Sequence, residues 1–219
     1  MLDAIGQVLP LAVVVALSPT PIIAVIVVLL GADAVRRGWA LLVGRMAGIV
    51  LVVAVFTLFA EYIVAVGLSP VIAAVVTIVF GLALVIVGVV GLTPRRTRDA
   101  PPRWIASLER MTASRAAVFG FVLALANPKV LAMGTAAGLT IGGLLAEVGK
   151  ALVVGAVYTI VAVLGVAVPV VAVTVLGARV GGTLRSIRTW LDRNSAVLMA
   201  ILLLVFGAIL LGHGLSGLG

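Results

Sequence analysis

The amino-acid sequence predicts an all-α integral membrane protein with six transmembrane helices, arranged as a 3+3 inverted repeat with broken helices 1 and 4. Three observations support this prediction. The 219 residues are 64% hydrophobic, with a mean hydropathy of +1.41 and only 10% charged residues, too few charges to coat a soluble globule of this size. Several apolar runs supply all or most of the roughly 20 residues that a membrane span needs. Two of these runs are interrupted by prolines.

The six apolar segments divide the chain into two membrane repeats joined by a basic linker. We expect repeat 1 at residues 1–92, the linker at 93–115 and repeat 2 at 116–219. Within the linker, an apolar helix face is typical of an amphipathic helix lying at the membrane surface, and its members are Trp104, Ile105, Leu108 and Met111. The predicted spans are 3–30, 38–66, 69–92, 116–139, 147–176 and 194–213.

Arginines gather in three loops that alternate onto one side of the predicted membrane domain. The positive-inside rule makes that side cytoplasmic, so we expect a multi-pass protein of the cytoplasmic membrane with both termini extracytoplasmic. The formal charge of +8 is then explained by topology, and we expect no nucleic-acid partner. The arginines are Arg36 and Arg37; Arg95, Arg96, Arg98, Arg103, Arg110 and Arg115; and Arg179, Arg185, Arg188 and Arg193.

The two halves of the chain resemble each other in order. Residues 38–44 resemble 149–155, and residues 79–92 resemble 205–218. These matches pair the second span with the fifth and the third with the sixth. A unit of three spans ends on the far side of the membrane, so its second copy is inserted upside down, which is a plan found in secondary transporters.

The remaining pair, the first and fourth spans, each contain a break near mid-membrane. Proline removes a backbone donor and drives the preceding residue out of helical geometry. We expect Thr20 and Asn127 to be N-caps, each followed by a proline as the first residue of a new half-helix. The alternative is that the prolines only bend the helices. The motifs are Ser18-Pro19-Thr20-Pro21 and Asn127-Pro128-Lys129.

Opposed half-helix N-termini would present unpaired N–H groups and partial positive charge to one region, which attracts anions. At about 1.5 Å per residue, Lys129 lies roughly 20 Å into the membrane, where a lysine usually marks a functional interior. Arg45 lies about 10 Å in and either lines the pathway or snorkels to the interface. Glu61 either carries a coupling proton or is an ordinary interfacial glutamate.

Several function classes are excluded by composition. The chain has no cysteine and one histidine, His213, so we expect no Cys-ligated or histidine-cluster metal site. No nucleotide-binding loop occurs, and no nucleophile motif or acid pair lies within a span. We therefore expect neither an enzyme nor a cofactor.

Residues 16–25, 102–107, 127–131 and 136–139 together resemble the GAP family, the peptidoglycolipid-addressing or sulfolipid-addressing proteins of actinobacteria, within the lysine-exporter superfamily. The resemblance runs nearly end to end and implies an exporter-like six-helix fold that delivers glycolipids toward the cell envelope. Arg45 is a departure, because an uncharged and often aromatic residue is expected there. The residues that match the family motifs are Ser18, Pro19, Pro21, Asn127, Pro128 and Lys129.

From these observations we expect a transporter or flippase that moves an anionic lipid-linked substrate, such as a glycolipid or polyprenyl-phosphate sugar, across the membrane. The alternative is an exporter of a small anionic or zwitterionic metabolite such as an amino acid. A lateral opening toward lipid favours the first, and a closed aqueous cavity the second. We expect membrane lipids and a second copy of the chain as partners. The predicted substrate-binding residues are Ser18, Pro19, Thr20, Pro21, Arg45, Asn127, Pro128 and Lys129, with Glu61 for proton coupling.

Overall fold

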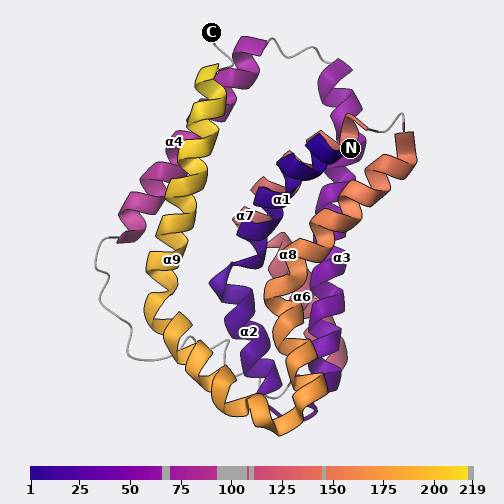
Figure 1. Ribbon diagram of the computed structural model, residues 1–219, viewed down its shortest axis with the longest axis vertical. Helices are drawn as coiled ribbons and strands as arrows, with labels where there is room; N and C mark the ends of the chain where they lie inside the picture. Colours follow the sequence, from indigo (N-terminus) through magenta and orange to yellow (C-terminus); the bar gives the residue numbers. More distant parts are fainter. Residues whose placement is uncertain (66–69, 93–107, 109–110, 145–146, 217–219) are drawn as a thin grey trace. The chain divides into compact units, whose positions relative to one another are not determined.

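The computed structural model describes residues 1–65, 70–92, 108, 111–144 and 147–216, and within this part of the chain every regular element is a helix. Figure 1 shows these helices, coloured along the sequence from the N-terminus to the C-terminus. The elements are α1 (Leu2–Ala16), α2 (Pro19–Leu29), α3 (Ala34–Ala65), α4 (Pro70–Leu92), α6 (Ala113–Leu125), α7 (Pro128–Gly142), α8 (Val148–Leu176), the 3₁₀ helix η2 (Gly177–Val180) and α9 (Gly181–Ser216).

Three single helices and two bent pairs have the length and apolar character of membrane spans. The single helices contain 34–60, 148–176 and 181–216, and the bent pairs are α1 with α2 and α6 with α7. The described part of the chain therefore holds three candidate spans, or up to five if each pair crosses once. The predicted span at 69–92 corresponds to α4, in which residues 81–90 form a shorter apolar helix.

Two predicted helix starts are wrong. Residue 38 was the expected start of the second span, but α3 begins at Ala34, so Arg36 and Arg37 lie on the helix. The larger error concerns α9, which begins at Gly181 instead of residue 194. Its first turns place Leu184 and Leu191 in the protein interior. Because these two leucines lie seven residues apart, they bury one face of a helix that also carries arginines.

The predicted linker helix falls largely outside the described residues, which exclude 93–107 and 109–110. Two members of its expected apolar face are described, and both Leu108 and Met111 are buried. The side chain of Glu61 also lies outside the described part of the structure, although its backbone belongs to α3.

The contacts divide the chain into two compact units, and the first contains residues 1–62 and 101–189. In this unit α1 packs against α7 and α8, α2 packs against α8, and α6 contacts α7. The core is formed mainly by valine, alanine and isoleucine side chains of these helices. Both broken pairs therefore belong to the same packed unit.

Glycines allow α3 to lie directly against α6 and α7. A Cβ atom at Gly44 would collide with the carbonyl of Ala117, and one at Gly120 with the carbonyl of Leu41. On α7, a Cβ atom at Gly138 would lie 2.8 Å from the carbonyl oxygen of Val53, which is further along α3. Small residues permit such close approach between membrane helices. The backbone of α3 is therefore held against both halves of the second broken pair.

The second unit contains residues 63–100 and 190–219. Within it α4 and α9 meet through glycines on both helices. A Cβ atom at Gly88 would lie 3.0 Å from Leu204, and one at Gly207 would lie 2.8 Å from the carbonyl oxygen of Gly81. The same small-residue packing therefore joins the two helices of this unit.

Candidate functional site

The first break lies between α1 and α2, whose axes are bent by 53°. Ser18 is the N-cap in an extended conformation, and Pro19 is the first residue of α2. The predicted N-cap, Thr20, is therefore wrong by two residues. The reason is that Pro19 already forces Ser18 out of helical geometry, while Pro21 falls in the first turn, where a missing N–H leaves no hydrogen bond broken.

The second break lies between α6 and α7, and here the bend is 69°. Asn127 is the N-cap and Pro128 the first helical residue, so this prediction is confirmed. The Oδ1 atom of Asn127 accepts a hydrogen bond of 3.0 Å from the backbone N–H of Lys129. The side chain thus satisfies one of the free donors at the start of α7.

The residues of the two motifs differ in exposure. Ser18, Pro19, Pro21 and Lys129 are buried, Asn127 is partly buried, and Thr20 and Pro128 are exposed. The hydroxyl of Ser18 has no hydrogen-bond partner among the described residues. Each half-helix therefore begins with a polar group enclosed by protein, a hydroxyl at the first break and an amine at the second.

Two cationic side chains are enclosed in the first unit. Arg45 is 1% exposed and Lys129 is 5% exposed. None of the three guanidinium nitrogens of Arg45, nor Nζ of Lys129, has a hydrogen-bond partner in the described part of the chain. The guanidinium of Arg45 thus lies inside the protein. Leaving such groups unpaired costs free energy.

Arg45 reaches this position because α3 packs so closely on α6. A Cβ atom at Gly120 would lie 3.0 Å from the backbone nitrogen of Arg45. Arg45 also follows Gly44, whose neighbour across the interface is Ala117. A charged side chain is thereby carried into a helix contact that is otherwise made of small residues.

Sequence reasoning missed two further buried polar groups, the hydroxyls of Tyr158 on α8 and Thr57 on α3. Both lack a hydrogen-bond partner among the described residues. The Tyr158 hydroxyl lies 3.9 Å from the position of a Cβ atom at Gly134 of α7. The signal that would have found Tyr158 is the adjacent pair Tyr158-Thr159 inside an otherwise apolar span.

No buried carboxylate accompanies these cations within the described residues. Besides Tyr158, the buried polar and charged side chains there are Ser18, Arg45, Thr57, Lys129 and Thr159. Asp33 is exposed at the start of α3, with one carboxylate oxygen 3.8 Å from Nη2 of Arg37. The interior of this unit is therefore positively charged wherever its side chains are described.

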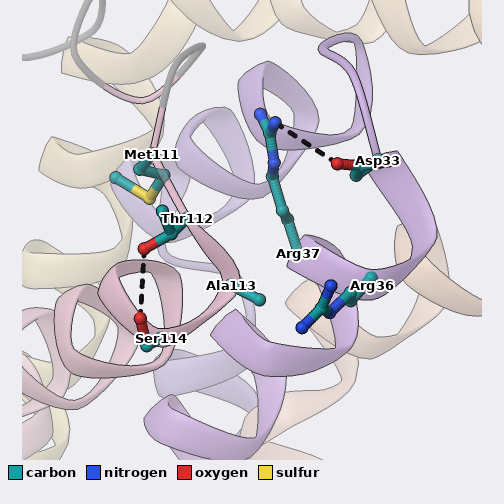
Figure 2. Close-up of a pocket in the computed structure, with 7 residues that line it drawn as sticks. All are labelled: Asp33, Arg36, Arg37, Met111, Thr112, Ala113 and Ser114. Carbon is teal, nitrogen blue, oxygen red and sulfur yellow. Dashed lines mark hydrogen bonds and ion pairs between the residues drawn. The ribbon is translucent and has the colours of Figure 1, made fainter.

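A polar cavity of about 330 Å³ lies between the starts of α3 and α6. Figure 2 shows Arg36 and Arg37 on one side of it and Thr112 on the other. Thr112 is the N-cap of α6, and its hydroxyl lies 3.0 Å from that of Ser114. The lining residues are Asp33, Arg36, Arg37, Met111, Thr112, Ala113 and Ser114.

A second cavity of about 540 Å³ is a groove between α3 and α8, and we refer to it as the apolar groove. Neither Arg45 nor Lys129 lines the groove or the polar cavity, so both cations are enclosed in this conformation. The groove is lined by Met46, Val50, Val53, Ala54, Thr57, Leu58, Ile141, Val148, Ala151, Leu152, Gly155, Ala156, Thr159 and Ile160.

Comparison with known protein families gives a match over nearly the whole chain. Residues 8–216 match the family described as Sap, sulfolipid-1-addressing protein, which covers nearly the whole chain, including both breaks and both buried cations. Neither a curated protein nor a solved structure matches the chain.

Proposed function

Because the chain belongs to the sulfolipid-1-addressing protein family, we propose that it moves an anionic lipid-linked substrate across the cytoplasmic membrane toward the cell envelope. A sulfolipid carries a negatively charged head group, and a glycolipid or polyprenyl-phosphate sugar with such a head group belongs to the same chemical class. The observation that carries the proposal is the enclosure of Arg45 and Lys129 without a buried carboxylate among the described residues.

Arg45 and Lys129 lack hydrogen-bond acceptors among the described residues. A charged residue near the centre of a membrane span costs at least about 2.5–3.5 kcal/mol on insertion scales. A sulfate or phosphate placed near Arg45 and Lys129 would supply the missing acceptors, and hydrogen bonds to charged groups contribute about 1.5–3 kcal/mol each. The buried hydroxyls of Ser18 and Tyr158, which also lack partners among the described residues, offer further donors for an anion bound within this unit.

The broken pairs supply a way for this site to open. We propose that the chain has six spans in a 3+3 inverted repeat, in which α1–α2 and α6–α7 are the corresponding broken members. Half-helices joined at a proline can tilt about the break without disturbing the rest of the helix. In transporters with this plan, the substrate lies where discontinuous helices meet.

A lipid substrate is favoured over a small metabolite by the apolar groove. Its lining is almost entirely hydrocarbon, whereas an amino acid exporter would need a polar chamber large enough to enclose its cargo. The polar cavity beside Arg36 and Arg37 lies at the end of α3 that the positive-inside rule assigns to the cytoplasm. We propose that the anionic head group enters from that end.

The test is a flipping assay in phosphatidylcholine liposomes that contain the purified protein. Three fluorescent lipids are compared: a sulfated glycolipid, phosphatidylglycerol and phosphatidylcholine, each detected by a membrane-impermeant reductant. We expect the two anionic lipids to cross at least about tenfold faster than in protein-free liposomes, and phosphatidylcholine to remain at the background rate.

The charge dependence is tested with the double variant Arg45→Gln/Lys129→Gln, which replaces both cations with shorter, uncharged polar side chains. We expect its rate for the anionic lipids to fall to background. Equal rates for all three lipids, or an unchanged double variant, would overturn the proposal. Efflux of radiolabelled glutamate with no lipid movement would support the small-metabolite alternative instead.

A further inference from the structure

The apolar groove has a defined length and direction. On α3 its lining residues recur at intervals of three or four between Met46 and Leu58, which places them on one stripe of the helix. This stripe covers twelve residue steps, or about 18 Å at the helical rise. Because the hydrocarbon core of a bilayer is about 30 Å thick, the groove is slightly longer than one leaflet.

The groove reaches the level of Arg45 on α3. Figure 1 shows α3 and α8 side by side, and α8 lines the groove from Val148 to Ile160. Arg45 immediately precedes Met46 on α3, and Tyr158 immediately precedes Thr159 on α8. The groove therefore extends along α3 to the level of the buried Arg45 guanidinium and along α8 to the level of the buried Tyr158 hydroxyl. Because successive residues of a helix point in different directions, these two side chains lie on other sides of their helices than the groove.

Close packing connects the groove wall to the second break. Gly134 of α7 lies against Val52 and the Tyr158 hydroxyl, and Val53 and Thr159, the next residues along α3 and α8, both line the groove. Lys129 lies five residues before Gly134 on the same helix. Lys129 and the groove are thus linked through α7, and the hydroxyl of Thr57, which lines the groove, is buried without a partner among the described residues.

We propose that the groove holds one acyl chain of the transported lipid while Arg45 and Lys129 hold its anionic head group, so that the two form one bipartite site. This inference rests on the proposed function. An anion at one end and an 18 Å apolar surface leading away from it match an amphiphile, about 18 Å being the span derived above from the helical rise. The volume of about 540 Å³ falls in the range of about 300–1,000 Å³ typical of ligand sites.

The chain offers a matched pair of variants. Ala54 and Ala47 are both exposed residues of α3, and seven residues, almost two full turns, separate them. They therefore lie on nearly the same face of the helix. Ala54 lines the groove and Ala47 does not. Ala54→Trp fills the groove without entering the core, and Ala47→Trp adds the same bulk at an exposed position that does not line the groove.

The experiment uses the full chain in phosphatidylcholine nanodiscs with a trace of photoreactive lipid. One probe is phosphatidic acid with a diazirine near the end of one acyl chain, and the other is phosphatidylcholine with the same chain. After illumination, mass spectrometry maps the labelled residues. We expect the phosphatidic acid probe to label groove residues about tenfold more than the phosphatidylcholine probe. Ala54→Trp should remove this excess, and Ala47→Trp should retain it.

The outcomes separate the groove from the proposed function. If the excess of phosphatidic acid labelling maps outside the groove and persists in Ala54→Trp, the groove does not hold the acyl chain. Recognition of the anionic head group would still be supported. Equal labelling of the groove by both probes would also contradict an acyl-chain site there, because the groove would then be an ordinary lipid-facing surface. An excess that persists in Arg45→Gln/Lys129→Gln would contradict the bipartite site. The flipping assay tests the proposed function independently.

Discussion

At the first break Ser18 precedes Pro19 and begins α2, and at the second Asn127 precedes Pro128 and begins α7. The backbone plan is the same, but the side chains differ. The Asn127 side chain caps its helix and Lys129 follows it, whereas the Ser18 side chain makes no cap hydrogen bond. Proline therefore sets the backbone geometry at both breaks, whereas only the second break carries a charged side chain, that of Lys129.

The two breaks are also supported differently. The first break is supported by a glycine of another helix, α8. A Cβ atom at Gly165 of α8 would collide with the carbonyl of Ala16 at the end of α1. The second is held through glycines of α7 itself, namely Gly134, Gly138 and Gly142, which face α3. We therefore expect substitutions near the second break to affect both transport and stability more strongly.

The largest expected effect is the loss of transport in Lys129→Gln. Removing the amine leaves the head group with Arg45 alone, so we expect transport of an anionic lipid to fall at least about tenfold, equivalent to about 1.4 kcal/mol. The control is Lys150→Gln, because Lys150 is the only other lysine and is partly exposed beside Glu147. Initial flipping rates in liposomes measure both, and equal rates for the two variants would contradict a role for the buried amine.

Next is the effect of Gly138→Ala on stability. The added methyl group would approach the Val53 carbonyl and the Thr57 backbone nitrogen, and such overpacking costs about 1–3 kcal/mol. Gly6→Ala in α1 meets nothing within 4 Å, and there the gain in helix propensity should slightly raise stability. Thermal unfolding in detergent, followed by circular dichroism, should give opposite shifts. Shifts of the same sign would show that α7 does not depend on close contact with α3.

A smaller effect is expected from Asn127→Ala. This variant removes the side chain that accepts from the Lys129 N–H, and loss of an N-cap typically costs about 1 kcal/mol. The same unfolding measurement applies. An unchanged unfolding temperature would mean that the bend of 69° is maintained without the cap.

The smallest effect is expected from Ser18→Ala. Its hydroxyl is buried without a partner among the described residues, so its removal should leave stability unchanged or slightly higher. If Ser18 contributes to head-group binding, transport should fall while the unfolding temperature stays constant. A loss of stability as large as that of Asn127→Ala would show that the two breaks are capped alike.

The positions of both breaks could be predicted because proline acts locally. Pro128 removes a donor and restricts its neighbour wherever it occurs, so the start of α7 followed from the sequence. At the first break, either Pro19 or Pro21 could start the new half-helix. The sequence prediction placed the N-cap at Thr20, whereas α2 begins at Pro19 with Ser18 as its N-cap. The start of α9 was missed because an arginine-rich segment forms a helix readily when two leucines bury one face of it.

The surroundings of Arg45 and Tyr158 could not be predicted. Both lie on long apolar helices, and the sequence does not reveal which face of one helix meets which neighbour. That choice depends on glycines such as Gly44 and Gly120, which permit contact between α3 and α6. Tyr158 enters the same interior from α8, more than one hundred residues from Arg45 along the chain. Long-range packing therefore decided the composition of the candidate site.

The most direct test of the central claim is lipid retention measured by native mass spectrometry of the detergent-purified protein. A sulfated glycolipid and a neutral glycolipid with identical acyl chains are added in equal amounts to the wild-type chain and to Arg45→Gln/Lys129→Gln. The account predicts that the wild-type chain retains the sulfated lipid about tenfold more and that the double variant shows no preference. Equal preference in both proteins would contradict recognition of the anion by the buried cations.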